Sequence, residues 1–499
     1  MIARRLGRSV LILERGTHPR VVIGESSTPL SNLLLEDIAE RYDLPTLKPL
    51  TKWGSWQRSY PELACGLKRG FSFYHHDLDH PGRQPAPDQL LVAASPHDEI
   101  ADTHWYRADL DEFLVRQAQT LGVEYVDKVV VDTLIDTGDE LRLGGSRAGV
   151  DVAYRARFVI DATGPRGFLH RALGLSDAGL PGYPHTRGLY SHFSGVGRLD
   201  AQTNDRGSED PPYAIDDAAV HHVFDGGWIW ILRFNNGITS AGVAATDECA
   251  ERLALSEGGD AWRRLLSQIP ALEEQFATAK PEQPFTYSPR LAFRSSAIAG
   301  SRWAMLPSAA GFVDPILSTG FPLTLLGVSR LAKIIEQGWD TGDLSERLQS
   351  YAMRTDGELL ATAKLVASLY ANMGNFPVFR ALSLLYFAAA SYSETALRLG
   401  KSDLAKSFLL QDHPAFGQPC RSLLDRAAGG VPEPDTDRIV REVYRIIGPI
   451  DVAGLCRNQP NSCYPVIAQD LLDTAWKLGA TQKEIVQVLD RAGFYAALV

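Results

Sequence analysis

The spacing of apolar and polar residues predicts a mixed α/β chain. Residues 10–13 form a short apolar run that ends in the acid Glu14, a pattern typical of a buried parallel strand. Apolar residues that recur every three or four positions predict helices over residues 30–42, 109–121, 320–338, 344–370 and 382–399. Short alternating segments rich in aromatic residues predict an antiparallel sheet between residues 188 and 297.

Turn and capping residues complete this outline. Thr28 followed by Pro29 predicts the start of the helix at residue 30, and the capping box of Thr481 and Glu484 predicts a last helix. Residues 51–101 are predicted to form short strands and loops, and residues 401–434 to form loops between helices. Further strands are predicted at 129–134, 140–143, 152–160 and 303–307.

The first residues have the pattern of a helix end, with Gly7 as the C-cap. Glu14 then stands at the carboxyl end of a strand, where dinucleotide-binding folds hold a ribose hydroxyl. The strand and the G-x-G-x-x-G turn that precede such a helix are not in the sequence. We therefore expect residue 1 to lie inside the first helix of a nucleotide-binding unit, with about 20 further residues encoded upstream.

Composition excludes several classes of protein. The 499 residues are 45% hydrophobic and 22% charged, which is typical of a globular protein rather than of a disordered or fibrous one. The net charge of -10 argues against binding to nucleic acid. No run approaches the roughly 20 apolar residues that span a bilayer, and no signal peptide follows Met1, so we expect a cytoplasmic protein. The five scattered cysteines favour thiols over disulfides or a zinc site.

Charged residues recur where predicted strands end or helices begin. Asp161 opens an Asp-Ala-Thr-Gly turn, and Asp314 lies in a Gly-x-x-Asp-Pro loop. Each segment alone is as compatible with a structural turn as with a binding site. The order of these charged residues along the chain resembles the order of the matching positions in the large FAD-dependent monooxygenase fold. In this sequence the residues are Glu14, Arg107, Asp161 and Asp314.

Several segments narrow the resemblance to the flavin-dependent halogenases of the tryptophan halogenase superfamily. Residues 312–320 fit the pattern Phe-x-x-Pro-x-x-Ser-x-Gly, residues 227–233 resemble Trp-x-Trp-x-Ile-Pro, and residues 66–73 resemble the segment that bears the family lysine. Residues 24–26 and 107–111 also match that family. The similarity is greatest to the branch that halogenates phenols and tetracycline-like polyketides, extends from residue 1 to about 340, and is looser beyond.

This resemblance implies an α/β fold with an FAD-binding, Rossmann-like module of the flavin monooxygenase and halogenase type. An inserted antiparallel substrate sheet and a helical C-terminal region complete the implied fold. The implied FAD module is made of residues 1–50, 101–180 and 296–340, without its N-terminal strand and glycine turn. Residues 51–100 and 181–295 would form the substrate sheet, and residues 341–499 the helical region.

The resemblance also gives candidate site residues. Lys68 would deliver the halogen rather than face solvent, with Lys52 as the second candidate. Glu25 would act as a general base, or else be satisfied by backbone amides. Trp228 and Trp230, which share one face of a strand, would form the flavin-side wall. FAD would be held by Glu14, Arg107, Asp161, Gly164, Asp314 (through ribityl hydroxyls), Pro315 and Gly320, and the halide by backbone amides at Ser318, Thr319 and Gly320.

The implied reaction is halogenation of an electron-rich aromatic precursor, phenolic by this resemblance, of an antibiotic or other secondary metabolite. Reduced FAD, supplied by a separate flavin reductase, and O2 would give a flavin hydroperoxide. Chloride or bromide would attack its distal oxygen to form hypohalous acid, which Lys68 would hydrogen-bond or convert to a chloramine. The aromatic substrate is either free or tethered to a carrier protein, and neither a nucleic acid nor a membrane is an expected partner.

Two departures from the family pattern leave other readings open. Arg233 stands where the family has proline, which puts chemistry at the flavin-side wall in doubt, and the glycine-rich turn for the FAD pyrophosphate is absent. The alternatives are an NADPH-dependent flavin hydroxylase of the same fold and a non-catalytic flavoprotein relative. No metal is expected, because the pairs His75–His76 and His221–His222 lack partners at metal-site spacing and indicate surface or hydrogen-bonded histidines.

Overall fold

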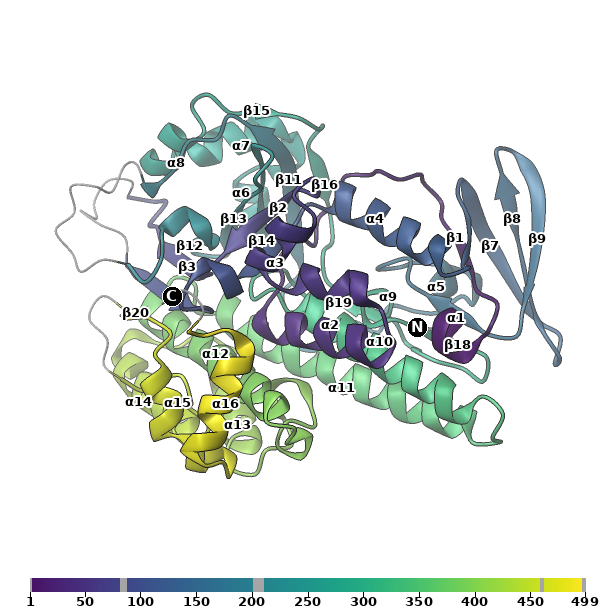
Figure 1. Ribbon diagram of the computed structural model, residues 1–499. Coiled ribbons are helices and arrows are strands. Elements are labelled where there is room, and N and C mark those ends of the chain that lie inside the picture. The colour runs from purple at the N-terminus through teal and green to yellow at the C-terminus, as the bar shows by residue number, and fades with distance from the viewer. Residues whose placement is uncertain (1, 81–87, 201–210, 458–461, 496–499) are drawn as a thin grey trace.

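A central sheet with helices on both faces organises the protein. Figure 1 presents the computed structural model, which describes residues 2–80, 88–200, 211–457 and 462–495. Residues 81–87 and 201–210, which belong to two regions predicted to contain strands, lie outside the described residues. Short helices lie above the sheet in Figure 1, long helices lie below it, and the C-terminal helices pack at one end.

The sheet has nine strands in the order β15-β11-β14-β13-β12-β3-β4-β20, with β16 also paired to β11. Neighbouring strands are antiparallel, except that β12 is parallel to β3 and β20 is parallel to β4. The predicted antiparallel sheet is confirmed for β11 to β14, and it also recruits strands from before residue 100. The strands are β3 (Gly70–His75), β4 (Gln89–Ala93), β11 (Thr186–Ser194), β12 (Ala219–Phe224), β13 (Gly227–Arg233), β14 (Ile238–Thr246), β15 (Lys280–Pro281), β16 (Thr286–Ser288) and β20 (Cys463–Tyr464).

Side-chain alternation divides the interior into two cores. Trp228 and Trp230 of β13 point into the core that includes the long helices α11 (Leu344–Tyr370) and α12 (Phe376–Arg398). Ile229 and Ile231 point to the opposite face, which is covered by α6 (Asp247–Arg252), α7 (Gly259–Leu266) and α8 (Pro270–Gln275). A strand with both faces buried reads as a continuous apolar run, which explains the composition of β13.

The part of the chain that was predicted to bind a nucleotide contains two short pairs of parallel strands. Strand β1 (Leu11–Leu13) is parallel to β6 (Glu124–Val126), and β10 (Val159–Asp161) is parallel to β18 (Trp303–Met305). Helix α1 (Ile2–Leu6) precedes β1 and ends at Gly7, whose φ of 59° confirms the predicted C-cap. The parallel direction of β1 was correctly predicted, but its burial was not. Leu11 and Ile12 are each 37% exposed, because β1 pairs only with β6 among the described residues.

Most predicted helices are confirmed, and three regions differ from the prediction. Residues 51–101 include a helix, α3 (Trp53–Ser59), besides β2 (Cys65–Lys68) and β3, and residues 401–434 include α13 (Gly417–Ala427). The stretch 152–160 is two strands in different sheets: β9 (Val150–Ala156) joins β7 (Val129–Asp136) and β8 (Leu141–Arg147), whereas β10 pairs with β18. The sheet of β7, β8 and β9 projects from one end of the molecule in Figure 1.

The remaining elements follow the predicted caps and junctions. Thr28 and Thr481 each cap a helix, as predicted, and Thr481 forms the predicted capping box with Glu484. Thr28 also forms a reciprocal capping box, with Ser31, which was not predicted. The predicted division into three modules stays a prediction. The other elements are α2 (Pro29–Arg41), α4 (Arg107–Thr120), α5 (Phe168–Ala172), α9 (Pro307–Ala310), α10 (Gly320–Gly338), α14 (Thr436–Ile447), α15 (Ala468–Asp473), α16 (Gln482–Ala492), β5 (Asp102–Trp105), β17 (Phe293–Arg294) and β19 (Gly311–Phe312).

Candidate active site

The candidate site contains a buried lysine, Lys68, which is the last residue of β2. Its side chain is fully buried, and its Nζ donates a hydrogen bond of 2.6 Å to the backbone carbonyl of Ser27. The same Nζ lies 3.9 Å from the ring centre of Phe71, a cation–π contact. Burial lowers the pKa of the Lys68 ammonium to about 7, against a smaller opposing effect of Asp102. The solvent-facing alternative for Lys68 is therefore wrong.

A second buried ionisable group faces Lys68 from the neighbouring strand. Asp102 is directly opposite Lys68 in the antiparallel pair of β2 and β5, and only 4% of its surface is exposed. Its Oδ1 accepts a hydrogen bond of 2.8 Å from Asn32, whereas its Oδ2 has no hydrogen-bond partner among the described residues. Burial raises the pKa of the Asp102 carboxyl to about 7, against an opposing effect of Lys68.

A cavity lies between α12 and the strands next to Lys68. It has an empty volume of about 890 Å³, part of which is open to solvent. Its walls are largely apolar, and the polar side chains among them include Ser391, Glu394 and Thr395 of α12. Phe71 both lines this cavity and contacts the Lys68 ammonium, so one ring connects the cavity to the buried amine. Apolar cavities with a few polar groups are typical sites for small organic ligands.

Glu25 forms a pair that the sequence did not predict. Its carboxylate lies 2.6 Å from Nε2 of His192, and both residues are less than 5% exposed. The alternative in which backbone amides satisfy this carboxylate is therefore wrong, because an imidazole is its partner. The rings of Tyr106 and Phe234 each lie 6.4 Å from the imidazole, so the pair sits in an aromatic enclosure. A buried carboxylate and imidazole at this distance are suited to holding or moving a proton.

Three of the predicted FAD-binding side chains make local contacts, two in turns and one along helix α4. Asp161 accepts hydrogen bonds from the backbone amides of Thr163, at 2.8 Å, and Leu169, at 2.7 Å. The guanidinium of Arg107 is paired bidentately with the carboxylate of Asp111 at 2.7 and 2.8 Å. Glu14 accepts a hydrogen bond of 2.7 Å from the amide of residue 16. The turn after Asp161 passes through Gly164 with a φ of 82°, a conformation that favours glycine. Their contacts with FAD stay predictions.

The Asp-Pro loop leads directly into the amino end of α10. The Asp314 carboxylate is 2% exposed and accepts hydrogen bonds from the hydroxyls of Tyr370, at 2.8 Å, and Tyr183, at 3.2 Å. Burial raises its pKa to about 7, although these donors oppose the shift. Because the carboxylate already has protein partners, its contact with ribityl hydroxyls, like that of Pro315 with FAD, stays a prediction.

The residues after Pro315 leave backbone amides free at the start of α10. Ser318 has a φ of 52°, which is uncommon for a residue with a side chain, and its amide donates to the Pro315 carbonyl. In the part of the chain that the structure describes, the amides of Thr319 and Gly320 have no hydrogen-bond acceptor. A Cβ atom at Gly320 would meet no atom within 4 Å. The amino end of a 19-residue helix is thus open to an anion or to an electron-rich ring.

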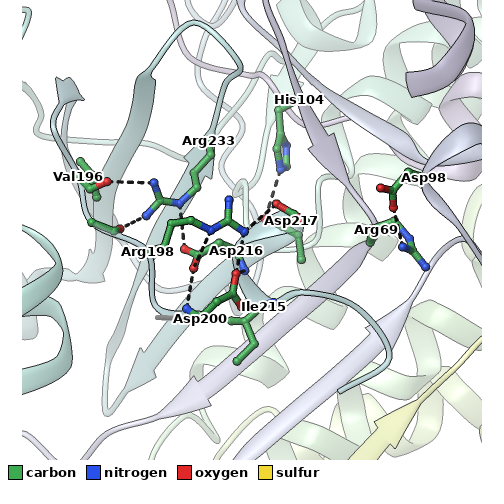
Figure 2. A network of polar contacts seen from close by, with 12 residues as sticks. Arg69, Asp98, His104, Val196, Arg198, Asp200, Ile215, Asp216, Asp217 and Arg233 are labelled. Atoms are coloured by element: carbon green, nitrogen blue, oxygen red, sulfur yellow. Dashed lines mark hydrogen bonds and ion pairs between the residues drawn. The ribbon is translucent and has the colours of Figure 1, made fainter. Parts of the chain in front are cut away.

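The two tryptophans of β13 share one face, as predicted, with ring centres 5.7 Å apart. Arg233, the departure from the family pattern, has its side chain on the other side of the strand. There its guanidinium contacts the Asp216 carboxylate at 2.9 Å and the carbonyls of Val196 and Gly197, in a network that also includes Arg198 (Figure 2). The arginine therefore does not introduce a cation beside Trp228 and Trp230.

His221 and His222 are buried, whereas His75 and His76 are only partly buried. The predicted hydrogen-bonded alternative is confirmed for His76, His221 and His222. Nε2 of His76 lies 2.9 Å from Nδ1 of His222, and the ring of His221 stacks on Phe73 with centres 4.4 Å apart. Among the described residues, no group of three or more histidine, cysteine, aspartate or glutamate side chains is placed to hold a metal ion. All five cysteines are free thiols. Within the described ranges, no helix is both long enough and apolar enough to cross a membrane.

Three residues of the site were not predicted from the sequence. Asp102, His192 and Phe71 come next to Lys68 or Glu25 only through strand pairing and packing. Phe71 had a usable signal, since it lies three positions after Lys68 in the same quoted segment. No sequence pattern pointed to Asp102 or His192, because a single acid or histidine in a strand does not show which distant residue it will contact.

Comparison with known proteins identifies the family. The family model of tryptophan halogenases matches residues 102–373, more than half of the chain. The monodechloroaminopyrrolnitrin halogenase PrnC of Pseudomonas fluorescens is 27% identical over 429 residues, which cover 83% of this chain and 74% of that protein. The tetracycline 7-halogenase of Kitasatospora aureofaciens is 26% identical over 402 residues, covering 78% and 70% respectively. The crystal structure of the halogenase PltM with phloroglucinol and FAD superposes with a TM-score of 0.80 at 24% identity, covering 93% of this chain and 96% of that one.

The chain belongs to the tryptophan halogenase family. It is an FAD-dependent oxidoreductase of the flavin-dependent halogenase class, and FAD, a halide and O2 are its cofactor and co-substrates. The predicted FAD-binding α/β fold with an inserted sheet and a helical C-terminal region is confirmed. The described residues fit FAD at two places, the open amino end of α10 and the partly exposed carboxylate of Glu14 after β1.

Proposed function

We propose that this halogenase acts on a small electron-rich aromatic, such as a phenol, which binds in the cavity beside α12. The observation that carries the proposal is the position of Phe71, which lines the cavity and contacts the buried amine of Lys68. An apolar cavity favours a flat aromatic ring, and the carboxylate of Glu394 in its wall is suited to accept a hydrogen bond from a phenolic hydroxyl.

Bound FAD, when reduced and exposed to O2, supplies the oxidation that converts halide to hypohalous acid. In the proposal the halide binds at the amides of Thr319 and Gly320, since the amide of Ser318 already donates to a carbonyl. Trp228 and Trp230 form the flavin-side wall. FAD is held by Glu14, Arg107, Asp161, Gly164, Asp314, Pro315 and Gly320.

Lys68 delivers the halogen to the ring. Its burial lowers the pKa of the ammonium to about 7, so a neutral amine is available to hold hypohalous acid or to take its halogen on nitrogen. This restrains a diffusible oxidant that is otherwise unselective. The pair of Glu25 and His192 accepts a proton from the substrate, in agreement with the distance of 2.6 Å between them.

The proposal includes a separate flavin reductase that supplies reduced FAD. Related halogenases include a brominase that acts on a pyrrole-2-carbonyl group held by a peptidyl carrier protein. Part of the cavity beside α12 is open to solvent, so its shape is compatible with a free or a tethered substrate.

Incubation with FAD, a flavin reductase, bromide and a panel of phenols, read by mass spectrometry, tests the function. We expect a bromide-dependent mass increase that disappears in Lys68→Ala, while FAD binding and O2 consumption continue. Lys68→Arg should restore little, because a guanidinium stays protonated. Lys52→Ala is the control, since Lys52 is a half-buried lysine whose Nζ likewise donates to a backbone carbonyl, that of Ala492, at 2.9 Å. Bromination by Lys68→Ala at nearly the wild-type rate would refute the proposal.

A further inference from the structure

We propose that Asp102 holds the proton that Lys68 exchanges during halogen transfer. This inference rests on the proposed role of Lys68 and adds a second residue, on another strand, to the same site. Asp102 exchanges a proton with the nitrogen of Lys68 and does not contact the substrate.

The geometry places the two groups together and leaves each short of partners. Residues directly opposite in an antiparallel pair have Cβ atoms about 5 Å apart, and Lys68 and Asp102 occupy such positions. Among the described residues, the Ser27 carbonyl is the only acceptor that the Lys68 ammonium reaches. Oδ2 of Asp102 has no partner in the same part of the chain, although the residue is only 4% exposed. A buried carboxylate oxygen without a donor costs free energy, so this atom favours carrying a proton.

The other ionisable groups around the pair do not replace this partnership. The imidazoles of His104 and His221 are buried near Lys68, and burial lowers their pKa values to about 3, so they stay neutral. From α12, Glu394 and Arg398 act on Asp102 in opposite directions, and they are bonded to each other at 2.7 Å. Tyr386 on the same helix is buried, and its pKa is raised by burial and by Asp102. Within the described ranges, the ammonium of Lys68 has a pKa of about 7, like the carboxyl of Asp102, which suits proton exchange between the two at neutral pH.

The proposed sequence conserves atoms and electrons. The neutral amine of Lys68 attacks the halogen of hypohalous acid, so the N–halogen bond forms, the halogen–oxygen bond breaks, and the hydroxide leaves with the amine proton as water. The carboxylic acid of Asp102 then protonates the halogenated nitrogen, directly or through a bridging water, which makes the halogen more electrophilic. The aromatic ring takes the halogen, and the bonding pair stays on nitrogen. The freed amine of Lys68 takes up the ring proton and passes a proton back to the Asp102 carboxylate, directly or through a bridging water. Hypohalous acid is reduced and the ring is oxidised, with no other co-reactant.

The pH dependence of this scheme has a definite sign. Activity needs Asp102 protonated, so it falls as pH rises through the pKa of that carboxyl, which burial has raised to about 7. It also needs the Lys68 amine neutral, so it falls as pH decreases below the pKa of the ammonium. Because the two groups interact, the alkaline loss is removal of the one proton that the active pair holds, and the acid loss is uptake of a second proton by the pair.

The decisive experiment is the pH profile of bromination by the full-length enzyme with FAD, a flavin reductase and a phenol that brominates. Asp102→Asn should lower the rate about 100-fold or more, which is typical when a general acid is removed, while FAD binding is retained. Its residual activity should no longer fall on the alkaline side. A folded Asp102→Asn enzyme that keeps the wild-type alkaline loss would overturn the inference.

A second variant decides the question even if Asp102→Asn does not fold. Asn32 donates to Oδ1 of Asp102 and so lowers the pKa of that carboxyl. Asn32→Leu should therefore move the alkaline loss to higher pH, and an unmoved alkaline loss in this variant would overturn the inference. Glu358→Gln is the matched control. It removes another buried carboxylate, which Arg330 pairs at 2.6 and 2.8 Å, and both limbs of the profile should stay in place.

Lys68→Ala, measured in parallel, separates this inference from the proposed function. If Lys68→Ala brominates at nearly the wild-type rate, the role of Lys68 and hence the whole proposed site is wrong. If Lys68→Ala is inactive but the alkaline limb of Asp102→Asn is unchanged, only the role of Asp102 is wrong.

Discussion

The hydroxyl of Tyr370 donates a hydrogen bond of 2.8 Å to the carboxylate of Asp314, which joins α11 to the Asp-Pro loop before α10. Nε1 of Trp228 in turn donates to the Tyr370 hydroxyl at 3.1 Å. A chain of hydrogen bonds therefore connects the central sheet, a long helix and the loop that precedes the open helix end. Since all three residues are buried, each bond is shielded from competing water.

Replacing Tyr370 by phenylalanine tests how strongly this chain stabilises the protein. Tyr370→Phe removes the acceptor of the Trp228 indole and one of the donors to the Asp314 carboxylate, which keeps Tyr183 and the amide of Ile316. We therefore expect the free energy of unfolding to fall by about 1–3 kcal/mol. Urea unfolding measures the change. Tyr444→Phe is the control, because its hydroxyl makes only a 3.5 Å contact with Tyr464, and it should change the value by less than about 0.5 kcal/mol. Equal losses in the two variants would contradict the role of Tyr370.

A side chain at Gly320 should separate stability from activity. A Cβ there meets no atom within 4 Å, so Gly320→Val should change the free energy of unfolding by less than about 0.5 kcal/mol. We expect it to lower bromination at least 10-fold, because the side chain covers the amides proposed to bind halide. The rate as a function of bromide concentration and the thermal unfolding temperature check both statements. Gly429→Val, at another glycine with open space around it, should leave both unchanged. Wild-type bromide dependence in Gly320→Val would place the halide elsewhere.

The pair of Glu25 and His192 should show energetic coupling. A double-mutant cycle with Glu25→Gln and His192→Asn should give a coupling free energy of about 1–3 kcal/mol in urea unfolding, since the bond involves buried groups at 2.6 Å. Asp77 and His80 provide the matched control, because that pair is exposed and 3.0 Å apart. The same cycle there should give less than about 1 kcal/mol. Coupling no larger than in the exposed pair would mean that the buried contact is not specific.

Buried imidazoles should make the protein sensitive to acid. Burial lowers the pKa of His76 to about 4, below the value of about 6.5 in the unfolded chain. The unfolded chain therefore binds a proton that the folded protein does not, so stability is full above pH 6.5 and is lost as pH falls towards 4. Urea unfolding at pH 7, 5.5 and 4.5 measures this loss.

The variant His76→Gln isolates this contribution from that of the carboxyl groups. Its free energy of unfolding should fall less steeply between pH 6.5 and 4.5 than that of the wild type, because one of the proton-binding groups is gone. His185→Gln, at an exposed histidine with a 3.6 Å ion pair, should keep the wild-type slope. Identical slopes for His76→Gln and the wild type would show that this imidazole titrates normally.

Local rules in the sequence determined the long helices, the caps and the motif-bearing turns. Helices α10 and α11 begin and end at the predicted residues, because apolar spacing is a property of the chain itself. The capping boxes at Thr28 and Thr481 formed for the same reason, since a cap needs only residues within one turn. The alternation of β13 also settled which face its tryptophans share. The same alternation places the side chain of Arg233 on the face opposite the tryptophans, because Arg233 follows Ile231 by two positions.

Only the tertiary structure decided which distant residues meet. Helix α3 was missed because it is short and is stabilised by burial of Trp56, which is fully enclosed, rather than by its own helix propensity. The partners of the site came from strand register and packing: Asp102 opposite Lys68, and His192 against Glu25. These contacts join residues up to 167 positions apart, so no local pattern encodes them. The lowered pKa of Lys68 follows from the same cause, since a side chain loses its water only when the whole fold closes around it.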